Sequence, residues 1–77
     1  MQSTVEFLLH KLFGDDAEFV VSENITDDNI TTITIDCEEE YKPRVIGKRG
    51  RIIKSIHNLT AIKAKREGVR IRVKVSD

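Results

Sequence analysis

Residues 45–51, VIGKRGR, place two glycines around two bases, after an apolar dipeptide and before a long helical pattern. Because glycine lacks a Cβ, the backbone at Gly47 and Gly50 can adopt turns that other residues resist and can approach a ligand closely. The helix that follows offers unpaired N–H groups and the positive end of its dipole. This arrangement suits a clamp for a sugar-phosphate backbone, with Lys48 and Arg49 supplying charge at the tip.

The glycine pair alone also fits an ordinary turn between helices, with bases exposed to solvent. The context favours the clamp, because Val45 and Ile46 can anchor the turn in the core while Arg51 and Lys54 extend the charge onto the helix. A nucleoside triphosphate loop is excluded, since Gly50 is not followed by Lys and Ser or Thr.

The N-terminal part of the chain predicts a helix and a hairpin. Residues Ser3 to Glu6 have the pattern of a capping box, and apolar residues at helical spacing predict a helix from Thr4 to Phe13. Residues 18–22 form a short strand-like run, residues 24–29 are polar, and residues 30–37 alternate between apolar and polar. In the second strand, one side is expected to carry Ile33, Ile35 and Cys37 and the other Thr32, Thr34 and Asp36.

The C-terminal part predicts a short helix, a long helix and a strand. Residues 38–45 are ambiguous, because three glutamates favour a helix start while Pro43 limits such a helix upstream. The long helix spans about Gly50 to Arg66, and residues 69–75 alternate as a strand with one buried face. The predicted buried stripe of the long helix consists of Ile52, Ile53, Ile56, Leu59 and Thr60.

This order of elements predicts one two-layer α+β domain over residues 1–77, with helices packed on the apolar face of a three-stranded sheet. The strand after the long helix can return as a parallel crossover, so a mixed sheet is expected.

Charge is unevenly distributed although the formal net charge is zero. Residues 1–40 hold one base and eleven acids, whereas residues 41–77 hold twelve bases and two acids. This asymmetry indicates that one surface meets a polyanion. The alternative is that the acidic and basic halves attract each other across one fold.

The motif at residues 45–51 resembles the signature turn of KH domains, and the order of elements resembles their type II arrangement, α-β-β-α-α-β. Chain length, and a long helix followed by a basic alternating strand, are similar to the KhpA family of small bacterial single-KH proteins. The resemblance implies a shallow groove for about four nucleotides of single-stranded RNA. Its other wall would come from residues 69–75 and the loop at residues 24–29, where Asp27 and Asp28 would repel phosphate. The candidate RNA-binding residues are Gly47, Lys48, Arg49, Gly50, Arg51, Lys54, Arg44, Arg70 and Arg72.

The family resemblance also implies homodimers and a second KH-containing partner of the KhpB type. Ile62 lies at the edge of the predicted stripe, so it is either a partly covered flank residue or, together with Leu59, a dimer contact.

Two function classes follow from the sequence. The first is a module that binds single-stranded RNA as a small RNA chaperone or post-transcriptional regulator; the second is a protein-interaction or dimerisation module with little binding of nucleic acid. No nucleophile–base pair, metal set or cofactor loop suggests an enzyme, and no cofactor is expected.

The single cysteine and the lack of roughly 20 consecutive apolar residues favour a cytoplasmic protein without a membrane span. The phenylalanines Phe7, Phe13 and Phe19 are expected in the core, which disfavours an RRM fold.

Overall fold

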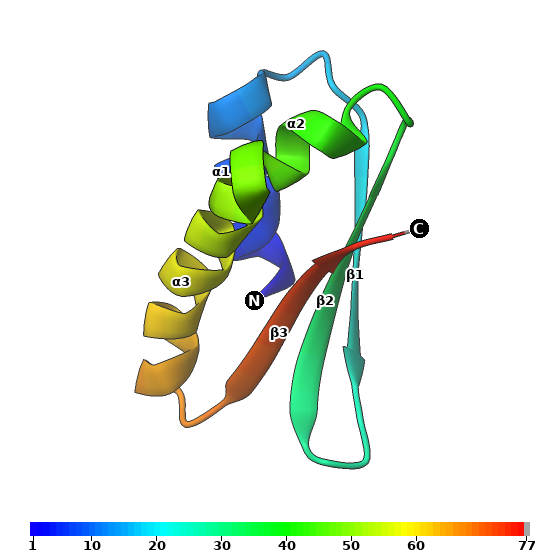
Figure 1. The fold of residues 1–77 in the computed structure, drawn as a ribbon. Helices are drawn as coiled ribbons and strands as arrows, with labels where there is room; N and C mark the ends of the chain where they lie inside the picture. The colour runs from blue at the N-terminus through cyan, green and yellow to red at the C-terminus, as the bar shows by residue number, and fades with distance from the viewer. Residues whose placement is uncertain (77) are drawn as a thin grey trace.

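The computed structural model, which describes residues 1–76, places its helices on one face of a three-stranded sheet (Figure 1). In chain order the elements are α1 (Gln2–Phe13), β1 (Phe19–Ile25), β2 (Ile30–Cys37), α2 (Lys42–Ile46), a 3₁₀ turn η1 (Lys48–Gly50), α3 (Arg51–Arg66) and β3 (Arg70–Val75). The α+β architecture and the element order expected for a type II KH domain are confirmed.

The sheet has the strand order β1-β2-β3 and mixes both kinds of pairing. β1 and β2 form an antiparallel hairpin, whereas β2 and β3 run parallel, with Ile33 opposite Val73. The parallel pair requires a crossover, which α2 and α3 supply. Because β2 lies in the middle, β1 and β3 each present a free edge.

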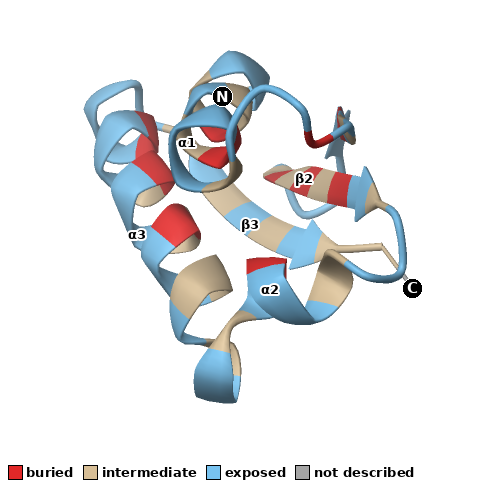
Figure 2. Cartoon of the chain, turned by 90° about the horizontal axis from the view of Figure 1, so that it is seen from above, coloured by how far each residue is buried: buried red, intermediate tan, exposed pale blue. Residues whose placement is uncertain are grey.

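The core lies between the helices and the covered face of the sheet, where the buried positions cluster (Figure 2). Its buried residues are Val5, Leu9, Val21, Ile33, Ile35, Val45 and Ile56. The expected alternation of the second strand is therefore correct. Thr60 is also fully buried, and its hydroxyl donates a hydrogen bond to the Ile56 carbonyl oxygen at 2.8 Å.

The N-terminus of α1 differs from the prediction. The helix begins at Gln2 and Met1 is its N-cap, without a capping hydrogen bond from a side chain. Ser3 is therefore already inside the first turn, and the predicted capping box is wrong. Instead, the Gln2 backbone N–H donates to Glu23 Oε1 on β1 at 3.1 Å, which ties the helix start to the sheet.

The hairpin is longer than expected, because β1 continues three residues beyond Ser22 to Ile25. Only residues 26–29 remain as the turn. The Thr26 hydroxyl donates to the Ile30 carbonyl oxygen at 3.2 Å, and the Asn29 N–H donates to the Thr26 carbonyl oxygen at 2.9 Å. The strand Ile30–Cys37 has the predicted bounds.

The structure resolves one ambiguous segment and shows that two predicted placements are wrong. The glutamates at 38–40 precede α2 and do not form its first turn, which begins with Lys42 and Pro43. Leu59 is 53% exposed, because the buried stripe of α3 is centred on Ile56 and Thr60 and Leu59 lies about 100° to one side of Thr60. Phe7 is 59% exposed on α1 instead of being in the core. Within residues 1–76, no helix is long and apolar enough to cross a membrane.

Candidate nucleic-acid interface

The turn between α2 and α3 has an unusual backbone. Gly47 has φ 78° and ψ 174°, Arg49 has φ 59°, and Gly50 has φ 74°. The Gly47 N–H closes α2 with a hydrogen bond to the Pro43 carbonyl oxygen at 2.8 Å, and the Gly50 N–H donates to the Gly47 carbonyl oxygen at 3.1 Å. The chain therefore changes direction within four residues, directly before the first turn of α3.

Gly47 and Gly50 are needed for different reasons. A Cβ at Gly47 would lie 2.8 Å from the backbone nitrogen of Ile52 and closer still to its side chain, so no larger residue fits there. A Cβ at Gly50 would meet nothing within 4 Å, and only the positive φ favours glycine. Gly47 thus packs the turn against α3, whereas Gly50 leaves the outer side of the turn open.

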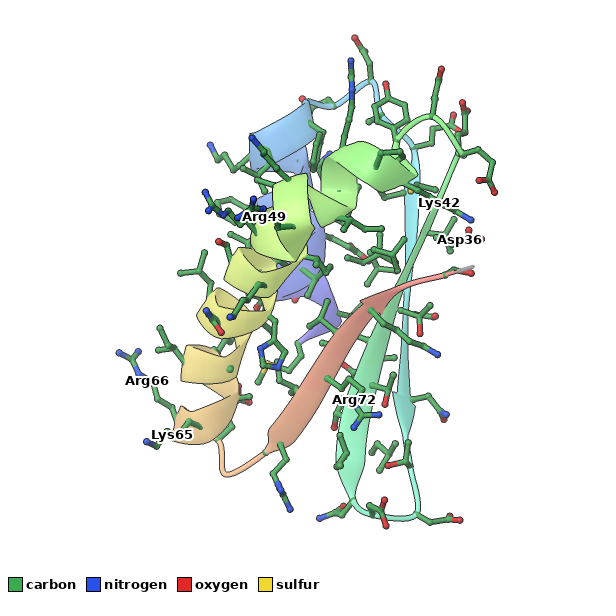
Figure 3. The ribbon with its side chains drawn as sticks, in the orientation of Figure 1. Asp36, Lys42, Arg49, Lys65, Arg66 and Arg72 are labelled. Carbon is green, nitrogen blue, oxygen red and sulfur yellow. The ribbon has the colours of Figure 1, made fainter. Side chains whose placement is uncertain are left out.

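The tip of the turn presents charge and backbone donors to solvent. Lys48 and Arg49 are exposed, and Figure 3 shows Arg49 directed away from the sheet. Among the described residues, the backbone N–H groups of Lys48 and Arg49 have no hydrogen-bond partner. Arg51 and Lys54, also exposed, lie on the first turn of α3, so the helix dipole and four bases act at the same end of the domain.

The dipeptide before the turn divides between core and surface. Val45 is fully buried, as expected for an anchor, but Ile46 is 40% exposed and adds an apolar spot beside the turn. Arg44 is exposed on α2, and its guanidinium lies 5.8 Å from the centre of the Tyr41 ring. This cation–π contact directs Arg44 toward the start of α2.

The basic residues of β3 do not join the turn. Ile71, Val73 and Val75 are partly buried toward the helices, so the alternate residues Arg70 and Arg72 project from the opposite, open face of the sheet. Figure 3 shows Arg72 on this side of β3. The site residues predicted from the sequence therefore fall into two groups, one at the turn and one on the open face.

Lys74 belongs to the second group and was missed by the sequence analysis. It follows Arg72 by two residues, is exposed, and lies opposite Thr34 in the sheet. The alternation predicted for residues 69–75 already puts Lys74 on the same side as Arg70 and Arg72, but Lys74 was not included among the candidate RNA-binding residues.

The acidic and basic halves do not neutralise each other through ion pairs. Within residues 1–76, Lys42 and Glu39 form the one ion pair between side chains of the two halves, at 3.1 Å and three residues apart. Mutual attraction through paired side chains thus does not account for the charge asymmetry, because the bases of the turn and of β3 lack an acidic partner among the described residues.

Two titratable groups with shifted pKa values lie near the start of α2, away from the turn: Cys37 at the end of β2 and Lys42 at the first position of α2. Burial raises the pKa of the Cys37 thiol, although nearby Lys42 acts in the opposite direction. The hydrogen bond from Lys42 to Glu39 raises the pKa of the Lys42 ammonium group. Within the described chain, no three His, Cys, Asp or Glu side chains gather as a metal site.

Leu59 and Ile62 form a small apolar surface on the outer side of α3. They are 53% and 57% exposed and lie three residues apart, so they are neighbours on the helix surface. Ile62 is thus more exposed than a partly covered flank residue. On a neighbouring part of this helix, the Lys63 ammonium group donates to the Thr4 hydroxyl of α1 at 3.1 Å.

Comparison with known structures supports the fold. A crystal structure of a variant of Aquifex aeolicus Era bound to GDP·AlF4− superposes with a TM-score of 0.66 at 23% identity. The match covers 97% of this chain and 30% of the Era chain, so this chain spans less than a third of that protein. At this identity the likeness concerns the fold alone. No curated protein matches the chain significantly in sequence.

A family model described as KhpA/KhpB, KH domain matches residues 2–75, and so includes the turn, both helices beside it and all three strands. With the α-β-β-α-α-β order and the glycine-bounded turn, this match covers nearly the whole sequence. The chain belongs to the KhpA/KhpB family of KH domains.

Proposed function

We propose that this chain acts as a single KH domain that binds single-stranded RNA, with the turn at residues 47–50 holding the sugar-phosphate backbone. The observation that carries the proposal is the open tip of this turn, where Lys48 and Arg49 combine exposed charge with free backbone N–H groups. KH domains clamp about four backbone nucleotides with a GxxG loop. We infer that the protein binds RNA in the cytoplasm without catalysing a reaction. Its role would be that of a small RNA chaperone or post-transcriptional regulator.

Electrostatics supports this function. The turn and the start of α3 bring together unpaired basic side chains at the positive end of a helix dipole. Such side chains contact phosphates, and phosphate contacts do not require a particular nucleobase. The four aromatic residues include no pair exposed on a strand for base stacking, so binding should depend mainly on the backbone and fall as salt rises.

Reversal of the charge at the tip tests the proposal. Lys48→Asp with Arg49→Asp keeps both glycines, and aspartate tolerates the left-handed backbone at position 49 better than most residues. The matched control is Lys65→Asp with Arg66→Asp, which makes the same charge change at the far end of α3 (Figure 3). Affinity for labelled single-stranded RNA, measured by fluorescence anisotropy at two salt concentrations, should fall at least about tenfold for the turn variant only.

Equal binding by the wild type and the turn variant, with both shown to be folded by circular dichroism and thermal unfolding, would refute the clamp. The same loss in both variants would show that net charge, and not the turn, determines affinity.

A protein-interaction role is the second candidate, and one observation favours it. The apolar surface of Leu59 and Ile62 on α3 is available for a second copy of the chain or for a KH-containing partner of the KhpB type. Light scattering at high concentration should give a dimer mass for the wild type and a monomer mass for Ile62→Asp. A monomeric wild type would exclude the homodimer.

A further inference from the structure

The open face of the sheet carries a row of basic side chains along β3. Arg70, Arg72 and Lys74 are exposed, alternate with residues that pack toward the helices, and so project from the same side. In the parallel pairing with β2, Arg72 lies opposite Thr32 and Lys74 opposite Thr34. In the part of the chain that the structure describes, no helix covers this side of the sheet (Figure 1).

The surroundings of this row are largely uncharged. On the open face, the middle of the sheet contributes Thr32 and Thr34, and their partners on β1 are Asn24 and Ser22. Asp36 is the acidic residue of this face within the described strands, and it lies at one end, opposite Val20. None of the three bases of β3 takes part in an ion pair or a side-chain hydrogen bond within residues 1–76. Their charge is therefore available to a polyanion.

The spacing of the bases suits a phosphate chain. Residues two apart on a strand are separated by about 6.6 Å, which is comparable to the distance between successive phosphates of an extended single strand. Within the described strands, no aromatic side chain lies on this face to stack a nucleobase, since β1 presents Val20, Ser22 and Asn24 there. The contacts would be electrostatic and independent of base identity.

Topology places the C-terminal end of this row at the same end of the domain as the turn. α3 starts at the turn, and β3 returns along it in the opposite direction, so the C-terminal end of β3 lies at the turn end of the domain. α2, which leads into the turn, contacts β3. β3 is also an edge strand, so an RNA strand leaving the turn can pass over the free edge of β3 onto the open face without crossing another β-strand.

The other end of the row is less suitable. Arg70 lies opposite Ile30, the first residue of β2, directly after the hairpin turn that carries Asp27 and Asp28. These carboxylates would repel phosphate near Arg70. Arg72 and Lys74 are farther from the hairpin and closer to the turn.

We propose that Arg72 and Lys74 form a second phosphate-binding surface on the open face of the sheet, which extends the RNA site beyond the nucleotides held by the turn. This inference rests on the proposed RNA binding and adds a site length, a path over the edge of β3 and a role for Lys74.

The test compares short and long RNA. The open-face variant is Arg72→Gln with Lys74→Gln, which keeps side-chain length at two exposed strand positions. Its matched control is Lys65→Gln with Arg66→Gln, which removes one lysine and one arginine from the exposed C-terminal end of α3. Each protein, including the turn variant Lys48→Asp with Arg49→Asp, is titrated with oligouridines of about 4 and about 12 nucleotides at several salt concentrations.

The open-face variant should bind the short oligomer like the wild type and lose at least about threefold in affinity for the long one. The slope of log affinity against log salt concentration for the long oligomer should become shallower by about 1.4, or about 0.7 for each basic side chain removed. Unchanged binding of the long oligomer, or the same loss in the α3 control, would overturn the second surface while the turn remains the site. If the turn variant binds both oligomers like the wild type, the proposed function itself is wrong, and the two failures are thereby distinguished.

Discussion

The hairpin turn at residues 26–29 and the turn at residues 47–50 are two exposed turns of opposite charge, with Asp27 and Asp28 in the first and Lys48 and Arg49 in the second. Each contains a residue other than glycine in the left-handed region, Asn29 with φ 62° and Arg49 with φ 59°. Asparagine adopts this backbone more readily than most residues, whereas arginine does so at a cost. Similar backbone conformations therefore occur once with a suitable residue and once with a costly one.

Both turns leave two backbone N–H groups at the tip without a partner among the described residues. In the hairpin, Thr26 exchanges hydrogen bonds with Ile30 and accepts one from Asn29, while the N–H groups of Asp27 and Asp28 have no partner among the described residues. In the turn before α3, the N–H groups of Lys48 and Arg49 stay free. The turns therefore differ in charge: the free donors of the hairpin belong to two aspartates, whose carboxylates repel phosphate, whereas those of the second turn belong to Lys48 and Arg49. The costly backbone of Arg49 is of the kind that clusters at ligand sites.

Substitution of Gly47 should have the largest effect on stability. Gly47→Ala combines a backbone conformation that suits only glycine with a contact against the backbone of Ile52, so we expect a loss of about 3–5 kcal/mol in the free energy of unfolding. Gly50→Ala, which meets no neighbour, should lose only about 1–2 kcal/mol. Urea denaturation measures both. Equal losses would show that the contact with Ile52 contributes little.

Arg49→Gly should separate stability from binding. Glycine removes the cost of the left-handed backbone, so the free energy of unfolding should rise by about 1 kcal/mol, while loss of the guanidinium lowers RNA affinity. Lys48→Gly is the matched control, because it removes one charge at a residue with negative φ and should destabilise by about 0.5–1 kcal/mol. Thermal unfolding and anisotropy titration of both proteins test this contrast. A stability loss in Arg49→Gly would mean that the side chain contributes more to folding than its backbone costs.

The turn and the long helix could be predicted because their signals are local. Two glycines around two bases and a 3.6-residue period specify a turn and an amphipathic helix without knowledge of the rest of the chain. The centre of a buried stripe is different, since it depends on what packs against the helix. Leu59 was misplaced for this reason, and Phe7 was misplaced because α1 buries Val5 and Leu9 and leaves Phe7 outside the core.

The face of β3 could not be chosen from sequence either. Alternation put Arg70 and Arg72 on the side opposite the apolar residues, but their relation to the turn depends on the helices that cover the sheet, which is a property of the tertiary structure. Similarly, the charge asymmetry was visible in the sequence, whereas the lack of ion pairs from the turn to the acidic half became evident only from side-chain positions.

Neutralisation of the hairpin acids should have the smallest effect and sharpens the contrast between the two turns. Asp27→Asn with Asp28→Asn removes repulsion near the Arg70 end of β3, so affinity for a long single strand should rise. We expect a rise of only about twofold, and only at low salt, because exposed charges separated by more than a Debye length of about 10 Å are already screened at 0.1 M salt. Asp15→Asn with Asp16→Asn makes the same charge change after α1 and serves as the control. A short oligomer should not respond to either variant, since its phosphates stay at the turn. A gain for the short oligomer as well would mean that the hairpin acts on the turn itself, and the hairpin would then share a single site with the turn.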